Sequence, residues 1–137
     1  MISEFAAAQA ATGGVAGVFL LFFAMAIGHC IGDYPLQGAF LAMGKNRHLD
    51  ASALFGGNQA PKDLWIHALT AHSLIHCGMV WLITGSALLA IVEFVLHWLT
   101  DFIRCEGWIS YSSDQGIHFG CKLFYAILIV WGVHLPF

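Results

Sequence analysis

The sequence predicts an all-α integral membrane protein built as a four-helix bundle. Two observations carry this prediction. Of the 137 residues, 59% are hydrophobic and only 9% are charged, whereas a soluble domain usually carries about 25% charged residues. The apolar residues also gather in four segments, each close to the roughly 20 residues that cross a bilayer as a helix. The composition excludes a soluble globular domain, and five Lys and Arg residues are too few for a nucleic-acid partner.

The four apolar segments are expected to be helices because lipid offers no hydrogen-bond partners for backbone groups. Within a single domain of residues 1–137, the spans cover about residues 15–36, 64–84, 86–103 and 116–137. Gly85 and Ser86 form a tight turn, so the second and third spans should pair as an antiparallel hairpin. The longer connections, residues 37–63 and 104–115, are expected to lie outside the membrane as loops.

The positive charges orient these spans. The first connection contains Lys45, Arg47 and Lys62, and the second contains Arg104. Since the cytoplasmic loops of membrane proteins carry an excess of Lys and Arg, both connections are predicted to be cytoplasmic. Both termini then lie on the outer side of the plasma (inner) membrane.

Every span carries two His or Asp residues at i and i+4, which places both side chains on one helix face. The four pairs are His29 with Asp33, His72 with His76, His97 with Asp101, and Asp114 with His118. Ionisable groups inside a membrane are costly and are candidates for function. The eight His residues of the chain, more than its five Lys and Arg together, are therefore a functional signal.

These residues fall into two layers at matching depth, about 6 Å apart at 1.5 Å per residue. The layer nearer the cytoplasm holds Asp33, His72, Asp101 and Asp114, and the deeper layer holds His29, His76, His97 and His118. Imidazole and carboxylate together suit divalent transition metals. We expect these eight residues to hold one or two divalent ions, zinc first, with manganese or iron as alternatives. Alternatively, the eight residues form an interhelical hydrogen-bond network without a metal.

Further polar residues lie on the same helix faces as the His and Asp pairs. Glu93 and Lys122 lie one turn beyond His97 and His118 and are expected to form a buried pair, since a lone charge there would be expensive. Gln37 and Gln115 are candidates for orienting a ligand. The order of the His and Asp pairs also repeats weakly, so the bundle is a candidate for two duplicated helical hairpins.

Five blocks of residues carry a family resemblance. They are His29-Cys-Ile-Gly-Asp33-Tyr-Pro-Leu-Gln37, Lys45-Asn46, His72-Ser-Leu-Ile-His76, Glu93-Phe-Val-Leu-His97-Trp-Leu-Thr-Asp101 and Asp114-Gln115-Gly-Ile-His118. From about Gly28 onward the chain resembles a family of short bacterial and phage multi-pass membrane proteins known as a domain of unknown function. The Ala-rich start, the insert around Phe55–Gln59 and Lys122 depart from that pattern. A remoter similarity to LexA-regulated inner-membrane proteins implies a metal-dependent hydrolase.

Three functions are compatible with these patterns. The first is a metal-dependent hydrolase acting on a lipid or phosphate ester at the cytoplasmic leaflet, with Asp101 or Asp114 as general base. The second is a transporter or channel for metal ions or protons. The third is a small structural subunit of a membrane assembly. The expected partners are membrane lipid and either further copies of the chain or a larger membrane assembly, with no nucleic acid.

Overall fold

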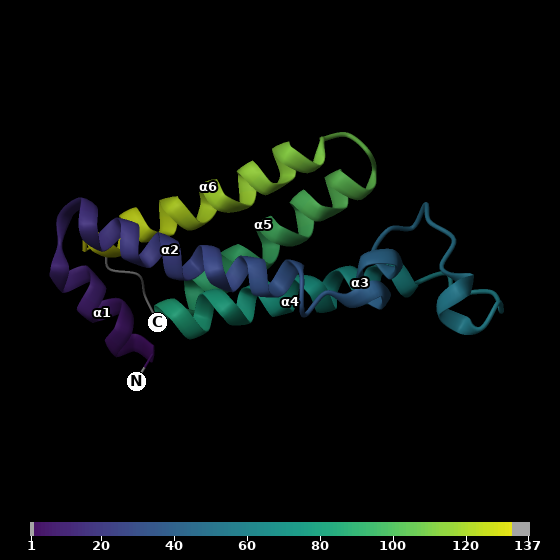
Figure 1. Ribbon diagram of the computed structural model, residues 1–137, viewed down its shortest axis with the longest axis horizontal. Coiled ribbons are helices and arrows are strands. Elements are labelled where there is room, and N and C mark those ends of the chain that lie inside the picture. The colour runs from purple at the N-terminus through teal and green to yellow at the C-terminus, as the bar shows by residue number, and fades with distance from the viewer. Residues whose placement is uncertain (1, 133–137) are drawn as a thin grey trace.

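The structure is a computed structural model that describes residues 2–132, and this part of the chain contains six α-helices, one short 3-10 helix and no strand (Figure 1). The predicted all-α class is therefore confirmed. The helices are α1 (Ile2–Thr12), α2 (Gly14–Asp33), α3 (Gly38–Gly44), α4 (Leu64–Thr84), α5 (Ala87–Cys105) and α6 (Tyr111–Val130), and the 3-10 helix covers Ser52–Phe55.

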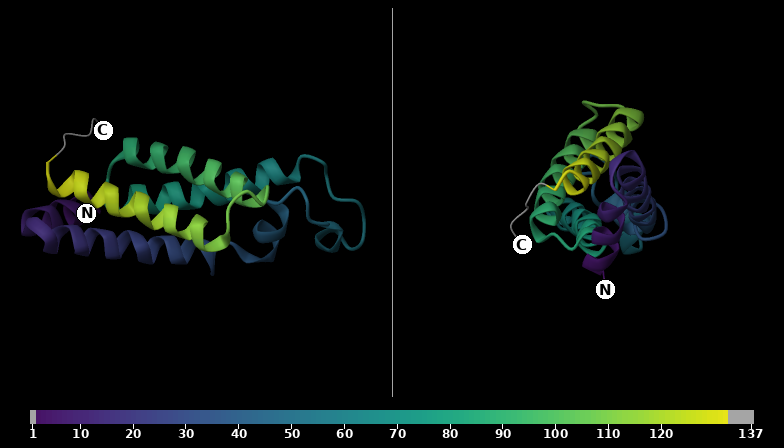
Figure 2. Two further views of the ribbon diagram at one scale, coloured as in Figure 1. Left: turned by 90° about the horizontal axis from the view of Figure 1, so that it is seen from above. Right: turned by 90° about the vertical axis from the view of Figure 1, so that its left-hand side faces the viewer.

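The four long helices α2, α4, α5 and α6 pack side by side as a bundle (Figure 2). Helix α4 packs along α5 and α2, and α6 packs along α2 and α5. Successive long helices run in opposite directions (Figure 1). As a result, the C-terminal ends of α2 and α5 meet the N-terminal ends of α4 and α6. We call this the α3 end of the bundle, because α3 packs there against α4.

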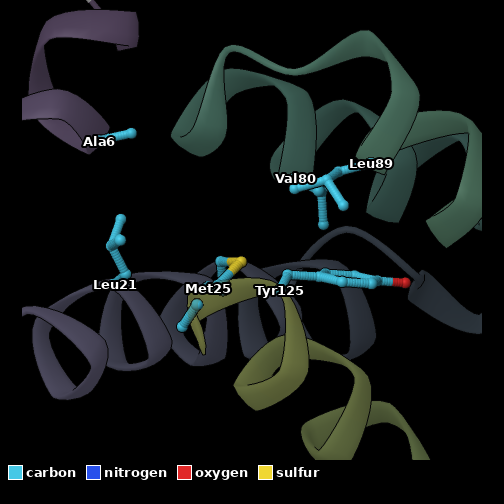
Figure 3. Packing of buried hydrophobic residues seen from close by; sticks show 7 residues of the cluster. Ala6, Leu21, Met25, Val80, Leu89 and Tyr125 are labelled. Carbon is cyan, nitrogen blue, oxygen red and sulfur yellow. The ribbon is translucent and has the colours of Figure 1, made fainter. Parts of the chain in front are cut away.

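The apolar core lies toward the opposite end of the bundle. Leu21, Met25, Val80, Leu89 and Tyr125 are buried there on all four long helices (Figure 3). Helix α1 folds back against α2, α4 and α6 at this end. The packing core and the polar interior therefore occupy different parts of the bundle.

The turn between α4 and α5 follows the sequence prediction. Gly85 ends α4 with a φ of 73°, a conformation that glycine adopts without steric cost. The Ser86 side chain then accepts a hydrogen bond from the Leu89 backbone N–H at 3.2 Å, which caps α5. The predicted antiparallel hairpin is confirmed.

Several boundaries differ from the sequence prediction. Helix α2 ends at Asp33, before residue 36, because Pro35 cannot continue a helix. Helix α6 begins at Tyr111 rather than near residue 116, because the Ser110 side chain caps it by accepting the Ser113 N–H at 3.1 Å. The predicted end of that span at residues 133–137 lies outside the described residues.

Two helices were not expected from the sequence. Helix α1 forms in the Ala-rich start, where helix propensity is high, and α3 forms inside the predicted loop 37–63. Within the described residues, only α2 and α4 are both long and apolar enough to cross a membrane. Helices α5 and α6 carry the charged residues Glu93, Asp101, Arg104, Asp114 and Lys122. Membrane crossing by all four long helices stays a prediction.

Candidate metal centre

All eight predicted ligand residues meet between the four long helices, at the α3 end. Each helix contributes one pair: His29 and Asp33 from α2, His72 and His76 from α4, His97 and Asp101 from α5, and Asp114 and His118 from α6. All are buried except Asp33, whose side chain is 11% exposed. The i,i+4 spacing on antiparallel neighbours thus converges on one region of the bundle interior.

The first group of possible ligands joins three helices. The Oδ1 atom of Asp33 lies 3.4 Å from His72 Nε2 and 3.1 Å from His76 Nε2. His97 completes this group, in which the ligand atoms lie within 4.8 Å of one another. Two ligands of a tetrahedral zinc ion at 2.0–2.1 Å are roughly 3.3 Å apart, so these spacings suit such an ion.

A second group lies beside the first. The carboxylates of Asp101 and Asp114 each place Oδ1 3.5 Å from His118 Nε2. The other oxygen of Asp101, Oδ2, lies 3.3 Å from His72 Nε2 of the first group. Asp101 therefore spans the two groups and can bridge them with one oxygen toward each.

Among the described residues, His29 does not belong to any group of side chains whose ligand atoms all lie within 4.8 Å of one another. The Gln115 amide donates to Asp33 Oδ2 at 2.9 Å and to Asp114 Oδ2 at 3.3 Å. Its oxygen therefore faces His29 Nε2 at 3.2 Å and accepts from it. The remaining ring nitrogen of His29 lies 3.2 Å from His76 Nδ1. The same His29 Nε2 also lies 3.3 Å from Asp33 Oδ2, so His29 lies against possible ligands on two sides, and its own role as a ligand stays a prediction.

These contacts favour one tautomer of His76. When His29 is neutral and its Nε2 donates to Gln115, its Nδ1 is an acceptor and His76 Nδ1 donates to it. The Nε2 atom of His76 then carries a lone pair and faces Asp33 Oδ1 at 3.1 Å. Two acceptors that face each other in a buried site cannot form a hydrogen bond, and a cation between them would satisfy both.

Other ligand atoms show the same lack of partners. Glu93 Oε1 lies 3.3 Å from His97 Nδ1, and this carboxylate accepts the Nδ1–H, so the lone pair of His97 lies on Nε2. Several buried atoms have no hydrogen-bond partner within the described part of the chain, namely Nδ1 and Nε2 of His72, Nε2 of His76, His97 and His118, and Oδ1 of Asp114. Unpaired buried polar atoms are rare and costly, and the donor set fits a divalent metal.

The polar residues predicted around the ligands also lie at the centre. Lys122 pairs with Glu93, and both side chains are 1% exposed. Gln37 accepts a hydrogen bond from Lys45 Nζ at 3.0 Å, and the same ammonium lies 2.6 Å from Asp101 Oδ2. Gln37 thus contacts the ligand set through Lys45 rather than directly.

A cleft of about 370 Å³ opens at the α3 end and reaches the three carboxylates Asp33, Asp101 and Asp114. Lys45 and Arg104 also line it. The charge pattern placed both cations in the connections but did not mark them as site residues. The Lys45-Asn46 block of the family resemblance was the available signal for Lys45, whose place depends on the packing of α3 against α4.

The fold and site thus define a class of helical protein with a buried His and Asp centre at one end of a four-helix bundle. The sequence model of the family described as "Protein of unknown function (DUF3307)" matches residues 21–134. The chain belongs to this family, and the matched region includes every residue of the centre. The comparisons found no matching curated protein and no matching solved structure.

Proposed function

We propose that this protein is an integral membrane protein that binds divalent metal at the His and Asp centre and hydrolyses a lipid or phosphate ester at the cytoplasmic leaflet. The observation that carries the metal assignment is the contact between His76 Nε2 and Asp33 Oδ1, two acceptors 3.1 Å apart in a buried site. Hydrogen bonds within the described residues leave the buried Nε2 atoms of His72, His76, His97 and His118 without a partner.

The distribution of polar residues supports a membrane location. The interior contains the buried His and Asp residues, while the exposed faces of the long helices are apolar. Examples are Phe19 and Phe23 on α2, Leu74 and Leu82 on α4, Ile91 and Leu99 on α5, and Phe124 on α6. A polar interior under an apolar surface is the reverse of a soluble protein, and lipid is the solvent that suits it.

Three groups have ligand spacing, and the two whose carboxylates line the cleft suit zinc, with manganese or iron as alternatives. The first contains three imidazoles and one carboxylate, and the second contains two carboxylates and one imidazole. Asp33, His72, His76 and His97 would hold one ion, and Asp101, Asp114 and His118 a second. A bound divalent ion would supply Lewis acidity and lower the pKa of water.

The chain itself supplies a proton acceptor. The Oδ1 atoms of Asp101 and Asp114 both lie 3.5 Å from His118 Nε2, but only Asp101 has its other oxygen engaged by Lys45, at 2.6 Å. Asp114 Oδ1 is also buried and has no hydrogen-bond partner in the described part of the chain. Of the two predicted general bases, Asp114 is therefore the better placed to take a proton, and Asp101 the better placed to bridge.

The interior beyond the centre favours an enzyme over the transporter alternative. A conduction path needs polar groups along the whole bundle. Past the Glu93–Lys122 pair, the described interior holds no further buried charged side chain; Leu21, Met25 and Leu89 fill it, with Thr84 and Ser86 buried only at the α4–α5 turn. The polar cluster therefore opens toward the α3 end, where the cleft lies.

The test is metal content of the purified protein in detergent, measured by inductively coupled plasma mass spectrometry. We expect at least about one ion per chain, lost in His76→Ala. His67→Ala is the matched control, because His67 lies on the same helix and its side chain is 75% exposed. Less than about 0.2 ion per chain in the wild type, with a melting temperature unchanged by chelator, would overturn the metal assignment.

A further inference from the structure

We propose that the substrate of this centre is a membrane lipid with a phosphate headgroup, which Arg104 and Lys45 bind in the cleft while an acyl chain lies in an apolar groove along α2. This inference rests on the proposed function and names its substrate class. Three observations support it. Two cations line the cleft, three carboxylates that could hold metal line it as well, and an apolar groove shares Tyr34 with it.

Arg104 is a cation in the cleft without a bound anion partner. Its Nε atom is buried and has no hydrogen-bond partner among residues 2–132. Arg47, by contrast, lies outside the cleft and pairs with Glu106 at 2.7 Å. An unpaired guanidinium is suited to phosphate because its N–H groups can donate to two phosphate oxygens at once. Arg104 therefore marks where the charged end of a ligand would bind.

The charge of the cleft depends on the metal. Asp33, Asp101 and Asp114 line it; Lys45 pairs with Asp101 at 2.6 Å, but without metal the three carboxylates outnumber the two cations and would repel an anion. Two divalent ions would more than neutralise them, and Lys45 and Arg104 then leave the cleft positive. An anionic ligand is thus the expected partner of the metal-loaded protein.

An apolar groove continues from the cleft along α2. Tyr34 lines both the cleft and the groove, which is formed by Phe23, Ile27, Ile31 and Phe119 among others. From Phe23 to Tyr34 the helix rises about 16 Å at 1.5 Å per residue, which is about half of the roughly 30 Å hydrocarbon core. A groove of this length and polarity suits one acyl chain within a single leaflet.

One side chain contacts both the groove and the centre. The Phe119 ring lines the groove, and its centroid lies 5.1 Å from that of His29. At the mouth of the cleft, the Tyr34 and Tyr111 hydroxyls lie 2.9 Å apart and join α2 to α6. Tyr side chains favour the headgroup depth of a bilayer, where the phosphate of a lipid would sit.

Binding measurements on zinc-loaded protein in detergent test this proposal. The probes are dioleoyl phosphatidic acid, dioleoylglycerol and glycerol 3-phosphate, each titrated by native mass spectrometry. We expect phosphatidic acid to bind at least about tenfold more tightly than either other probe. Arg104→Gln should weaken that binding at least about tenfold with unchanged metal content. The matched control Arg47→Gln should stay within about twofold of the wild type.

A second variant tests the groove. Ile31→Trp should fill it and weaken phosphatidic acid binding, while glycerol 3-phosphate binding stays unchanged. Leu74→Trp is the control, since Leu74 is 53% exposed on α4, away from the groove. Glycerol 3-phosphate binding as tight as that of phosphatidic acid would overturn the lipid assignment in favour of a soluble phosphate ester.

The outcomes separate this inference from the proposed function. Wild-type protein without metal would overturn the proposed function and, with it, the inference. Two results would overturn the inference alone. One is metal-loaded wild-type protein that binds none of the three probes, and the other is an Arg104→Gln variant that binds phosphatidic acid as tightly as the wild type.

Discussion

Replacement of Gly32 by Ala adds a single methyl group directly against the candidate metal centre. Gly32 lies in the last turn of α2, beside Asp33. A Cβ atom at this position would lie 2.5 Å from His76 Cε1 and 2.7 Å from His76 Nε2. Both distances are shorter than real Cβ contacts, so the imidazole must move.

The size of that movement follows from the contacts around the ring. Ordinary van der Waals contact begins at 3.4 Å, so the ring must retreat by about 0.9 Å from its 2.5 Å position. It stacks on His97 with centroids 3.8 Å apart and lies 4.7 Å from the His72 ring, so little space receives it. Overpacking of this kind costs about 1–3 kcal/mol. A zinc–nitrogen bond of about 2.0–2.1 Å does not survive such a shift.

We expect Gly32→Ala to weaken zinc binding at least about 100-fold, the upper end of what residues around a metal site usually contribute. The assay is competition for zinc with a fluorescent chelator, together with circular dichroism to confirm that the helices persist. Gly120→Ala is the control, because a Cβ atom there meets nothing within 4 Å. If Gly32→Ala binds zinc within about threefold of the wild type, His76 is not the ligand that the structure indicates.

Three further changes have defined outcomes. Chelator should lower the melting temperature of the wild type and leave that of His76→Ala unchanged, because ligand binding to the folded state stabilises it; equal shifts would contradict this. Lys122→Met should lower the free energy of unfolding by about 3–5 kcal/mol, because it leaves Glu93 charged and buried. In chemical denaturation, the double variant Lys122→Met/Glu93→Gln should recover most of that loss. Arg47 and His48 hold the pKa of Glu106 below its ordinary value of 4.5. That carboxylate therefore contributes stability above about pH 4.5 that is lost in more acidic solution, and Glu106→Gln should show a flatter acid limb in pH-dependent melting.

The convergence of the eight candidate ligands was predictable from the sequence because helix periodicity determines which residues share a face. Two residues at i and i+4 share a helix face whatever the rest of the fold does. Four such pairs in antiparallel neighbours can meet only if their depths match, and the sequence positions of Asp33, His72, Asp101 and Asp114 provide that match. The same reasoning placed Glu93 and Lys122 at one depth, where the structure pairs them.

The contributions of Lys45 and His29 were not predictable in this way. Lys45 lies in a connection, where no periodicity relates sequence to position, and its ammonium reaches Asp101 because α3 packs against α4. His29 has the spacing of a ligand, but its role depends on which nitrogen bears the proton. That is decided by Gln115 and His76, which are far from it in the sequence.

The buried Glu93–Lys122 pair explains how the centre ends and the apolar core begins. Glu93 accepts from His97 Nδ1 at 3.3 Å, which directs the lone pair of His97 Nε2 toward the ligand group. An isolated carboxylate in that position would be costly, and Lys122 from α6 offsets its charge. Beyond this pair lie Leu89 and Tyr125 of the apolar core. The pair therefore orients one possible ligand and neutralises its own charge at the boundary, beyond which the described interior holds no further buried charged side chain.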